Sequence, residues 1–311
     1  MTEISAWRTR DIPSQNGRHI LITGATGGLG YETAMALAGA GADVLLTGRN
    51  ASKGAAALAH ICQQHPQARV QFEHLDLASL NSVRDFAHAQ HEAGKPIDVL
   101  INNAGVMMPP KRTMTVDGFE LQLGTNYLGH YALTALLLPL LRGGNRPRVV
   151  SLASVAHRRA RIHFDDLQAQ RRYHAWRVYG QSKLALLLFA LELQRHSARG
   201  NWGIASMAAH PGYASTDLFH NAAGTDSWLK RMTSLVQPWV GQSAAAGALP
   251  TLYAASAADA VGGAYYGPDG WQELKGNVQI ARVARYARDK AVAARLWQVS
   301  AELTGVTWPT P

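Results

Sequence analysis

The sequence predicts an α/β fold in a single domain, with a doubly wound parallel sheet flanked by helices on both faces. Short apolar runs of strand length alternate with longer runs that carry apolar residues at helical spacing. A glycine-rich turn joins the first apolar run directly to the first helical run, as in a βαβ unit. The chain has 311 residues, of which 47% are hydrophobic and 16% charged, enough for one large domain with a buried core.

The expected elements alternate along the chain. Strands are predicted at residues 19–23, 42–47, 69–74, 98–101, 148–153 and 203–209. Helices are predicted at residues 31–40, 51–65, 79–93, 119–141 and 178–199. Further on, Tyr265-Tyr-Gly-Pro268 fits a last edge strand and turn, and residues 281–303 fit one or two terminal helices. We therefore expect an N-terminal tail over residues 1–16 and a single domain over residues 17–311.

Composition argues against several classes of function. The formal charge is +9, from 30 basic and 21 acidic residues, but the cations are scattered and fit no nucleic-acid-binding motif. The 13 histidines are dispersed without metal-ligand spacing, and the lone Cys62 cannot form an internal disulfide. No signal peptide and no apolar run long enough to span a membrane is recognisable. We expect a cytoplasmic protein that binds neither nucleic acid nor metal.

The first predicted βαβ unit has the layout of a Rossmann-type dinucleotide site. The segment Thr23-Gly-Ala-Thr-Gly-Gly-Leu-Gly30 follows a strand and opens a helix. Glycines let the backbone approach a pyrophosphate, and the helix N-terminus offers it unpaired N–H groups. The glycines at 24, 28 and 30 depart from the G-x-G-x-x-G spacing, so the turn depends on its surroundings for support.

The end of the second predicted strand indicates which dinucleotide is bound. Thr47-Gly-Arg-Asn50 contains no carboxylate that could bind a ribose 2′-hydroxyl. Arg49 can instead form a fork on a 2′-phosphate. The sequence therefore favours NADP over NAD, with a solvated arginine at a strand end as the alternative.

Tyr179 and Lys183 stand four positions apart where a long predicted helix begins. Residues at this spacing share one helix face. A cation beside a phenol lowers the pKa of the phenol, which could then exchange a proton with a carbonyl or alcohol oxygen at neutral pH. A surface helix with an incidental tyrosine and lysine fits the same pattern, so the spacing alone does not establish a catalytic pair.

Seven motifs follow one another over about residues 17 to 220. They are the glycine turn, Asp76-Leu77, Asn102-Asn-Ala-Gly105, Asn126, Ser154, Tyr179-x3-Lys183, and His210-Pro-Gly212 with Thr216. In this order they resemble the short-chain dehydrogenase/reductase family. Asn126-Tyr-Leu-Gly-His130, Ser154-Val-Ala-His157 and the run 162–167 are similar to its retinol-dehydrogenase-like branch.

The resemblance implies a catalytic role for Asn126, Ser154, Tyr179 and Lys183. Tyr179 would be the general acid/base, Lys183 would lower its pKa and hold the nicotinamide ribose, and Ser154 would hydrogen-bond the substrate oxygen. Asn126 would kink its helix and help to hold a water that relays protons to Lys183. The implied cofactor-binding residues are Gly24, Thr26, Gly28, Leu29, Gly30, Arg49, Asn50, Asp76, Leu77, Asn103, Ala104, Gly105, Tyr179, Lys183, Pro211, Gly212 and Thr216.

Two departures from the family pattern bear on assembly and location. Ser154 and Tyr179 are 25 positions apart (179 − 154), more than in many relatives. The segment His157 to Trp176 between them could cover the face on which many relatives dimerise, so a monomer stays open beside a homodimer. The N-terminal anchor of membrane-bound retinoid enzymes in this branch is not recognisable, which argues against an integral membrane enzyme.

The substrate-specificity region is expected at about residues 213–242. Trp228, Met232 and Trp239 recur there at spacings close to helical, which fits either a lid over an apolar substrate or a helix packed on the core. The run 107–110, Met-Met-Pro-Pro, follows the carboxyl end of a predicted strand, where ligands of open α/β sheets bind. It fits an adaptable apolar wall or core filler.

The predicted function is an NADP(H)-dependent oxidoreductase that interconverts a carbonyl and an alcohol on an apolar or aromatic small molecule. The alternative is a non-catalytic NADP-binding regulator on the same fold. Such proteins typically lose the tyrosine or the lysine, whereas this chain keeps Tyr179 and Lys183. An epimerase of the extended relatives would need a larger substrate domain than the stretch after residue 220 provides.

Overall fold

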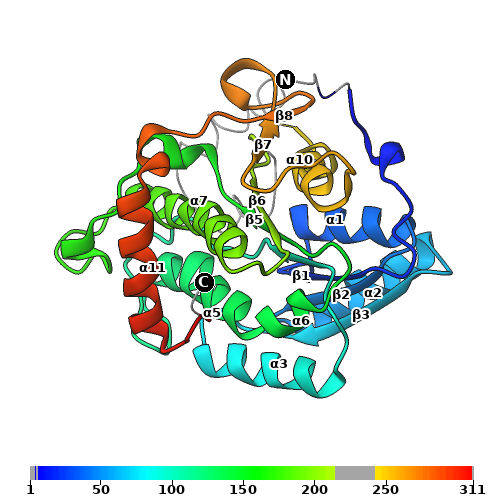
Figure 1. The fold of residues 1–311 in the computed structure, drawn as a ribbon, viewed down its shortest axis with the longest axis horizontal. Helices are drawn as coiled ribbons and strands as arrows, with labels where there is room; N and C mark the ends of the chain where they lie inside the picture. The colour runs from blue at the N-terminus through cyan, green and yellow to red at the C-terminus, as the bar shows by residue number, and fades with distance from the viewer. Residues whose placement is uncertain (1–3, 5, 214–241, 310–311) are drawn as a thin grey trace.

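The computed structural model describes residues 4, 6–213 and 242–309. These residues form a central eight-stranded sheet in the order β3-β2-β1-β4-β5-β6-β7-β8. Helices cover both of its faces (Figure 1). Strands β1 to β7 are parallel, and β8 pairs antiparallel with β7. The predicted doubly wound α/β fold is therefore confirmed, with one antiparallel strand added at the edge.

The six strands predicted before residue 210 all occur, each within two residues of its expected ends. The strands are β1 His19–Thr23, β2 Asp43–Gly48, β3 Arg69–His74, β4 Val99–Asn102, β5 Arg148–Leu152, β6 Ala205–Ala209, β7 Tyr265–Pro268 and β8 Val278–Ile280. The prediction that β7 is the edge strand is wrong, because the backbone of β8 pairs along it. Strand β8, which is only three residues long, was not predicted.

Alternating side chains of the buried strands pack into two separate helix layers. In β1, Leu21 contacts the layer of α3 Leu80–Ala93, α5 Gly129–Leu136 and α7 Ala175–Arg199. Its neighbours Ile20 and Ile22 contact the layer of α1 Gly28–Gly39, α2 Ala51–Gln64 and α10 Ala244–Ser256. This period of two is the pattern of a strand buried on both faces. Helix α10 was not predicted; it is alanine-rich, contains Pro250 and is buried over most of its length.

The continuous helix predicted over residues 119–141 is wrong. The chain instead forms α4 Leu121–Leu123, a π-helical turn η2 Gly124–Leu128, then α5 and α6 Leu138–Arg142. The π-helical turn carries Asn126, in agreement with a kink at that residue. The second break comes before Pro139, whose ring removes a backbone donor and prevents the helix from continuing.

Both ends of the chain pack on the domain. Trp7, in the predicted tail, meets the ring of Tyr253 on α10 edge-on, with centroids 5.5 Å apart. Helix α11 Lys290–Thr304 lies across α7 and α5. The segment His157 to Trp176 was expected to cover the face on which many relatives dimerise. In this part of the chain lie two short 3-10 helices, η3 Val155–Arg159 and η4 Phe164–Asp166, and η3 packs on α7. Among the described residues, both η3 and α11 therefore pack on α7, and the contact with α11 was not predicted.

Trp297 holds α11 against α7. Its ring stacks on Phe189 with centroids 5.7 Å apart, and its side chain is 8% exposed. We expect Trp297→Ala to lower the free energy of unfolding by about 3–5 kcal/mol, because it removes buried aromatic surface and leaves a cavity. Denaturant unfolding measures the change. Trp271, which is 79% exposed, provides the control: Trp271→Ala should change stability by about 0.5 kcal/mol or less. Equal losses in the two variants would contradict this packing.

Candidate active site

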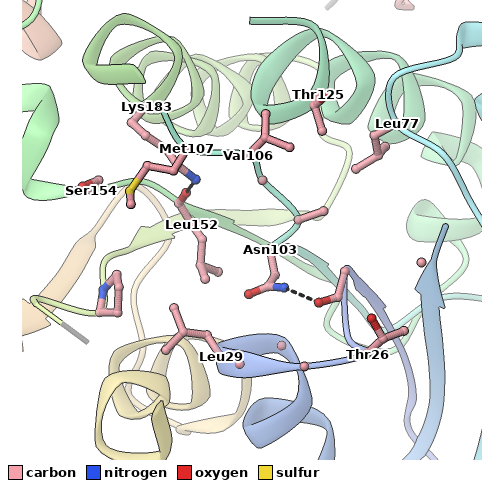
Figure 2. Close-up of a pocket in the computed structure, with 18 of the residues that line it drawn as sticks. Thr26, Leu29, Leu77, Asn103, Val106, Met107, Thr125, Leu152, Ser154 and Lys183 are labelled. Carbon is pink, nitrogen blue, oxygen red and sulfur yellow. Dashed lines mark hydrogen bonds between the residues drawn. The ribbon is translucent and has the colours of Figure 1, made fainter. Parts of the chain in front are cut away.

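A cavity of about 430 Å³ opens at the carboxyl ends of the central strands (Figure 2). Strands β1 and β4 are neighbours there although β2 and β3 separate them in sequence, and ligands of open α/β sheets bind at such a switch point. The predicted site residues that line the cavity are Gly24, Thr26, Gly28, Leu29, Gly30, Arg49, Asp76, Leu77, Asn103, Ala104, Gly105, Ser154, Tyr179, Lys183, Pro211 and Gly212. Asn50 and Asn126 do not line it, and Thr216 lies outside the described residues.

Two glycines of the turn between β1 and α1 have no room for a side chain. Gly24 has a φ of +64°, and a Cβ there would lie 2.8 Å from the Cα of Ala104. A Cβ on Gly30 would collide with the side-chain amide of Asn103. Gly27, the N-cap of α1, supplies no capping side chain, so the first N–H groups of this helix are available to an anion. The turn therefore has the shape and the donors that a pyrophosphate requires.

Asn103 fixes the turn after β4 against the turn after β1. Its side-chain amide donates to the carbonyl oxygens of Thr23 and Gly24 at 2.7 and 3.1 Å. Its backbone N–H and that of Ala104 donate to Thr23 Oγ1 at 2.9 and 3.0 Å. Figure 2 shows one of the side-chain bonds reaching the glycine turn. The two walls of the cavity are thus joined by four hydrogen bonds.

Two cations line the end of the cavity near β2. Arg49 follows the strand directly, and Lys53 lies in the first turn of α2. The side chain of Asn50 accepts a hydrogen bond from the backbone N–H of Lys53 at 2.9 Å. Asn50 therefore acts as the N-cap of α2 and not as a lining residue. A phosphate at this end would meet two positive charges, where the sequence predicted one.

Asp76 and Leu77 form the adjoining wall after β3. The Asp76 carboxylate accepts a hydrogen bond from the N–H of Ala78 at 3.0 Å, which shapes the turn. Its own N–H donates to the hydroxyl of Ser82 at 3.0 Å. Leu77 is 5% exposed and presents an apolar edge to the cavity. Leu77 gives this wall an apolar side chain against which a base ring could pack.

Ser154, Tyr179 and Lys183 meet at the other end of the cavity. Ser154 follows β5 and caps η3, where its Oγ accepts the N–H of Ala156 at 3.2 Å. On α7, the Lys183 ammonium lies 6.0 Å from the ring centroid of Tyr179. It donates to the carbonyl of Leu152 at 2.8 Å. The four-residue spacing thus places the phenol and the ammonium on one face, as the sequence predicted.

Burial shifts the pKa values of both Tyr179 and Lys183. It raises the pKa of Tyr179 to about 12, against a smaller opposing effect of the Ser154 side chain. Burial also lowers the pKa of Lys183 to about 8. The expectation of a lowered tyrosine pKa is therefore wrong in this structure, because loss of solvent penalises the phenolate more than the surrounding groups stabilise it. Tyr179 is a protonated phenol at neutral pH.

Asn126 connects the segment after β4 to helix α7. Its side-chain oxygen accepts the N–H of Val106 at 2.7 Å. Its side-chain nitrogen donates to the carbonyl of Val106 at 3.0 Å and to the hydroxyl of Ser182 at 2.9 Å. A Cβ on Gly105 would lie 3.2 Å from Asn126 Oδ1 and 3.5 Å from Lys183 Nζ. Asn126 therefore holds Gly105 close to the lysine without itself lining the cavity.

The cavity is apolar near Tyr179. Met107, Val155, Trp176 and Tyr213 line it there. The Trp176 ring lies 5.9 Å from that of Tyr179 and is 47% exposed, so it can cover an apolar ligand. Of the predicted apolar wall at 107–110, only the first methionine lines the cavity. The residues proposed as a lid, at 228–239, lie outside the described part of the chain.

Lys53, Val106 and Trp176 are lining residues that were not predicted, whereas Tyr213 falls at the start of the predicted substrate-specificity region. Two of them carried a local signal. Trp176 precedes Tyr179 by three positions and so shares its helix face. Lys53 follows Asn50, a residue type common at N-caps, and so falls in a first helical turn. Val106 directly follows the predicted Gly105, but its own side chain gave no indication of a binding role.

Residues 6–213 and 242–309 meet neither the requirements of a metal site nor those of a membrane-spanning helix. No group of three or more histidine, cysteine, aspartate or glutamate side chains is arranged to hold a metal ion. Within the same ranges, no helix has the length and apolar character needed to cross a bilayer.

Comparisons with known proteins agree with this geometry. The family model described as short chain dehydrogenase matches residues 18–226. A polyprenol dehydrogenase of Danio rerio is 36% identical over 307 residues, which cover 97% of this chain and 91% of that protein. Retinol dehydrogenase 13 of Homo sapiens is 40% identical over 298 residues, covering 94% of this chain and 86% of that protein.

Solved structures of similar proteins have the same fold. A putative uncharacterized protein from Mycobacterium paratuberculosis superimposes with a TM-score of 0.80 at 40% identity, covering 98% of this chain and 100% of that one. An active-site complex of Pseudomonas aeruginosa RhlG with NADP superimposes with a TM-score of 0.65 at 25% identity. That match covers 81% of this chain and 94% of the other.

The raised pKa of Tyr179 can be tested by titration. Because the folded site favours the protonated phenol, Tyr179 should not ionise at the pH near 10 where free tyrosine does. The ultraviolet difference spectrum between the wild-type protein and Tyr179→Phe, recorded from pH 7 to 10 without added cofactor, should therefore show no phenolate absorbance. A phenolate step below pH 10 would contradict the dominance of burial at this site.

Proposed function

The chain belongs to the short-chain dehydrogenase family, and we propose that it is an NADP(H)-dependent oxidoreductase that interconverts a carbonyl and an alcohol on an apolar small molecule. One observation carries the proposal. Ser154, Tyr179 and Lys183 line one end of the same cavity whose other end is the glycine turn with Arg49 and Lys53. A dinucleotide along this cavity would place its phosphates at the turn and its reactive ring at the hydroxyls.

The hydroxyl groups match what carbonyl reduction requires. NADPH, when bound, supplies the hydride that the carbonyl carbon accepts. Ser154 Oγ already accepts the N–H of Ala156, so its own proton is free to donate to the substrate oxygen and to stabilise the negative charge that develops there. Tyr179, protonated at neutral pH, then donates its proton to that oxygen as general acid.

Lys183 supports the tyrosine. Its ammonium is fixed on the carbonyl of Leu152, and it lies over the Tyr179 ring. After the phenol gives up its proton, the nearby positive charge stabilises the phenolate. The reverse reaction needs a deprotonated phenol. The raised pKa keeps this deprotonated form scarce at neutral pH.

The cations at β2 favour NADPH over NADH. Arg49 and Lys53 line the cavity, and the strand end from Thr47 to Asn50 has no carboxylate to bind a ribose 2′-hydroxyl. A guanidinium and an ammonium together suit a 2′-phosphate dianion. The NADP complex of the Pseudomonas aeruginosa relative supports the same cofactor.

The substrate is proposed to be a long apolar alcohol or its aldehyde. Met107, Val155 and Trp176 give the cavity an apolar wall beside the reacting hydroxyls. The relatives named for retinol and polyprenol are 36–40% identical to this chain. An apolar wall can bury such a chain while Ser154 and Tyr179 bind the single polar oxygen.

Removal of the phenolic oxygen should abolish most turnover. Tyr179→Phe should lower kcat for NADPH oxidation with an apolar aldehyde by about 10²–10⁴-fold, because the general acid is lost. The assay uses a panel of ketones and aldehydes that includes retinal. Tyr286→Phe, an exposed tyrosine bonded to Arg161, is the matched control and should keep wild-type activity. Equal turnover by Tyr179→Phe would exclude this mechanism, and tight NADPH binding without turnover on any substrate would favour a regulatory protein.

Cofactor selectivity should depend on both cations. Arg49→Ala and Lys53→Ala should each weaken NADPH binding by about 10–100-fold, with little effect on NADH, since each removes a charge-assisted contact to the 2′-phosphate. Titration of each variant with both cofactors measures the ratio. Arg288→Ala, on the exposed 3-10 helix η6 Arg285–Arg288, controls for a general loss of positive charge. Equal weakening for NADPH and NADH would contradict a role at the 2′-phosphate.

A further inference from the structure

The segment from Asp269 to Ala284 returns from the sheet edge and contacts both turns at the catalytic end of the cavity. At one turn, Leu274 accepts the N–H of Tyr213 at 2.8 Å, and its carbonyl leaves no room for a Cβ on Gly212. At the other turn, the N–H of Ala284 donates to His157 Nε2 at 3.3 Å. This segment lies beyond the matched family region 18–226.

Glu273 binds the first of these turns through His210. The N–H of Gly212 donates to His210 Nδ1 at 3.1 Å, so this nitrogen carries no proton. The proton is therefore on Nε2, which donates to Glu273 Oε2 at 3.0 Å. His210 is fully buried and burial lowers its pKa, in agreement with a neutral ring. The carboxylate thus sets the orientation of the ring that holds the Gly212 backbone.

Glu273 binds the second turn through Arg158. Its Oε2 forms an ion pair with the Arg158 guanidinium, which also donates to the carbonyl of Gln272 at 3.0 Å. Arg158 lies on η3, the 3-10 helix that Ser154 caps. The second carboxylate oxygen accepts the N–H of Arg282 at 3.0 Å. One largely buried side chain, 12% exposed, therefore joins the turn of the catalytic serine to the turn of Pro211 and Gly212.

The backbone conformation at Glu273 supports a specific role for this residue. Gln272 and Glu273 have φ values of +53° and +58°, a region that residues with a Cβ rarely adopt. Such a conformation persists only where the surroundings enforce it. Here it allows the carboxylate to meet His210, Arg158 and the N–H of Arg282 at once.

His157 makes a parallel connection. Its Nδ1 donates to the carbonyl of Ser154 at 2.6 Å, and its Nε2 accepts the N–H of Ala284. The rings of His157 and His210 both pack on Tyr265, with centroid separations of 5.4 and 5.0 Å. The returning segment therefore holds both turns around one aromatic ring.

We propose that Glu273 is a positioning residue for catalysis: through His210 and Arg158 it fixes the turn of Ser154 relative to the turn of Pro211 and Gly212. Ser154 would hydrogen-bond the substrate oxygen, and the second turn lines the same end of the cavity. The proposal rests on the proposed function for its catalytic consequence. Small errors in the relative position of reacting groups lower rates strongly while leaving distant binding contacts intact.

Glu273→Gln tests the proposal with little change in shape. It should lower kcat by roughly tenfold or more, while NADPH affinity, which depends on the distant phosphate contacts, should change by less than about threefold. Glu302→Gln, an exposed carboxylate on α11, should leave both unchanged. If Glu273 only stabilised the fold, thermal stability would fall but kcat per NADPH-binding site would stay at the wild-type value. That result would overturn the proposal.

A second experiment, amide hydrogen exchange, needs neither turnover nor cofactor. Amide hydrogen exchange of Glu273→Gln should accelerate in residues 155–159 and in 210–213 together, because the link between the turns is weakened. Acceleration confined to residues 269–284 would overturn the proposal. If the wild-type protein showed no turnover, the proposed function would fail, and hydrogen exchange would still decide the role of Glu273.

Arg158→Gln provides an independent variant should Glu273→Gln fold poorly. It should produce the same joint acceleration and a similar loss of kcat. Because both residues act through one network, the double variant should be no slower than the slower single variant. Additive losses in kcat would show two unrelated effects and contradict a shared positioning role.

Discussion

The hydroxyl of Thr23 determines how the two walls of the cavity meet. It lies at the end of β1, fully buried, and accepts the N–H groups of Asn103 and Ala104 at 2.9 and 3.0 Å. The turn after β4 is thereby held against the glycine turn, so closely that a Cβ on Gly24 would overlap Ala104. Together with the two bonds of the Asn103 side chain, this contact joins the two turns into one binding surface at the switch point between β1 and β4.

His130 extends the same connection toward helix α7. Its Nδ1 lies 3.0 Å from the carbonyl of Asn126, which can only accept, so Nδ1 carries the proton and Nε2 accepts from Thr23 at 2.8 Å. Burial lowers the pKa of His130 to about 3, which keeps the ring neutral. The side chain of Asn126 then bonds Ser182, next to Lys183 on α7. Thr23 at the end of β1 is thus connected through His130 and Asn126 to Ser182, which directly precedes Lys183 on α7.

Features encoded within a few residues could be predicted from the sequence, whereas those that depend on distant contacts could not. The glycine turn and the Tyr179–Lys183 pair are local patterns, and the structure brings them to one cavity. The tyrosine pKa was predicted in the wrong direction because burial depends on the whole fold. The bond between His210 and Glu273 joins residues 63 positions apart, and neither residue type signals the other.

The most direct test of the proposed chemistry is to follow the hydride. The protein would be incubated with an apolar aldehyde such as retinal and with NADPH carrying two deuterium atoms at C4 of the nicotinamide. Mass spectrometry of the product alcohol should then show one added deuterium, since the proposed complex has its phosphates at Arg49 and Lys53 and its reactive ring beside Ser154 and Tyr179. Product alcohol without deuterium, or bound NADPH that reduces no carbonyl, would contradict the account.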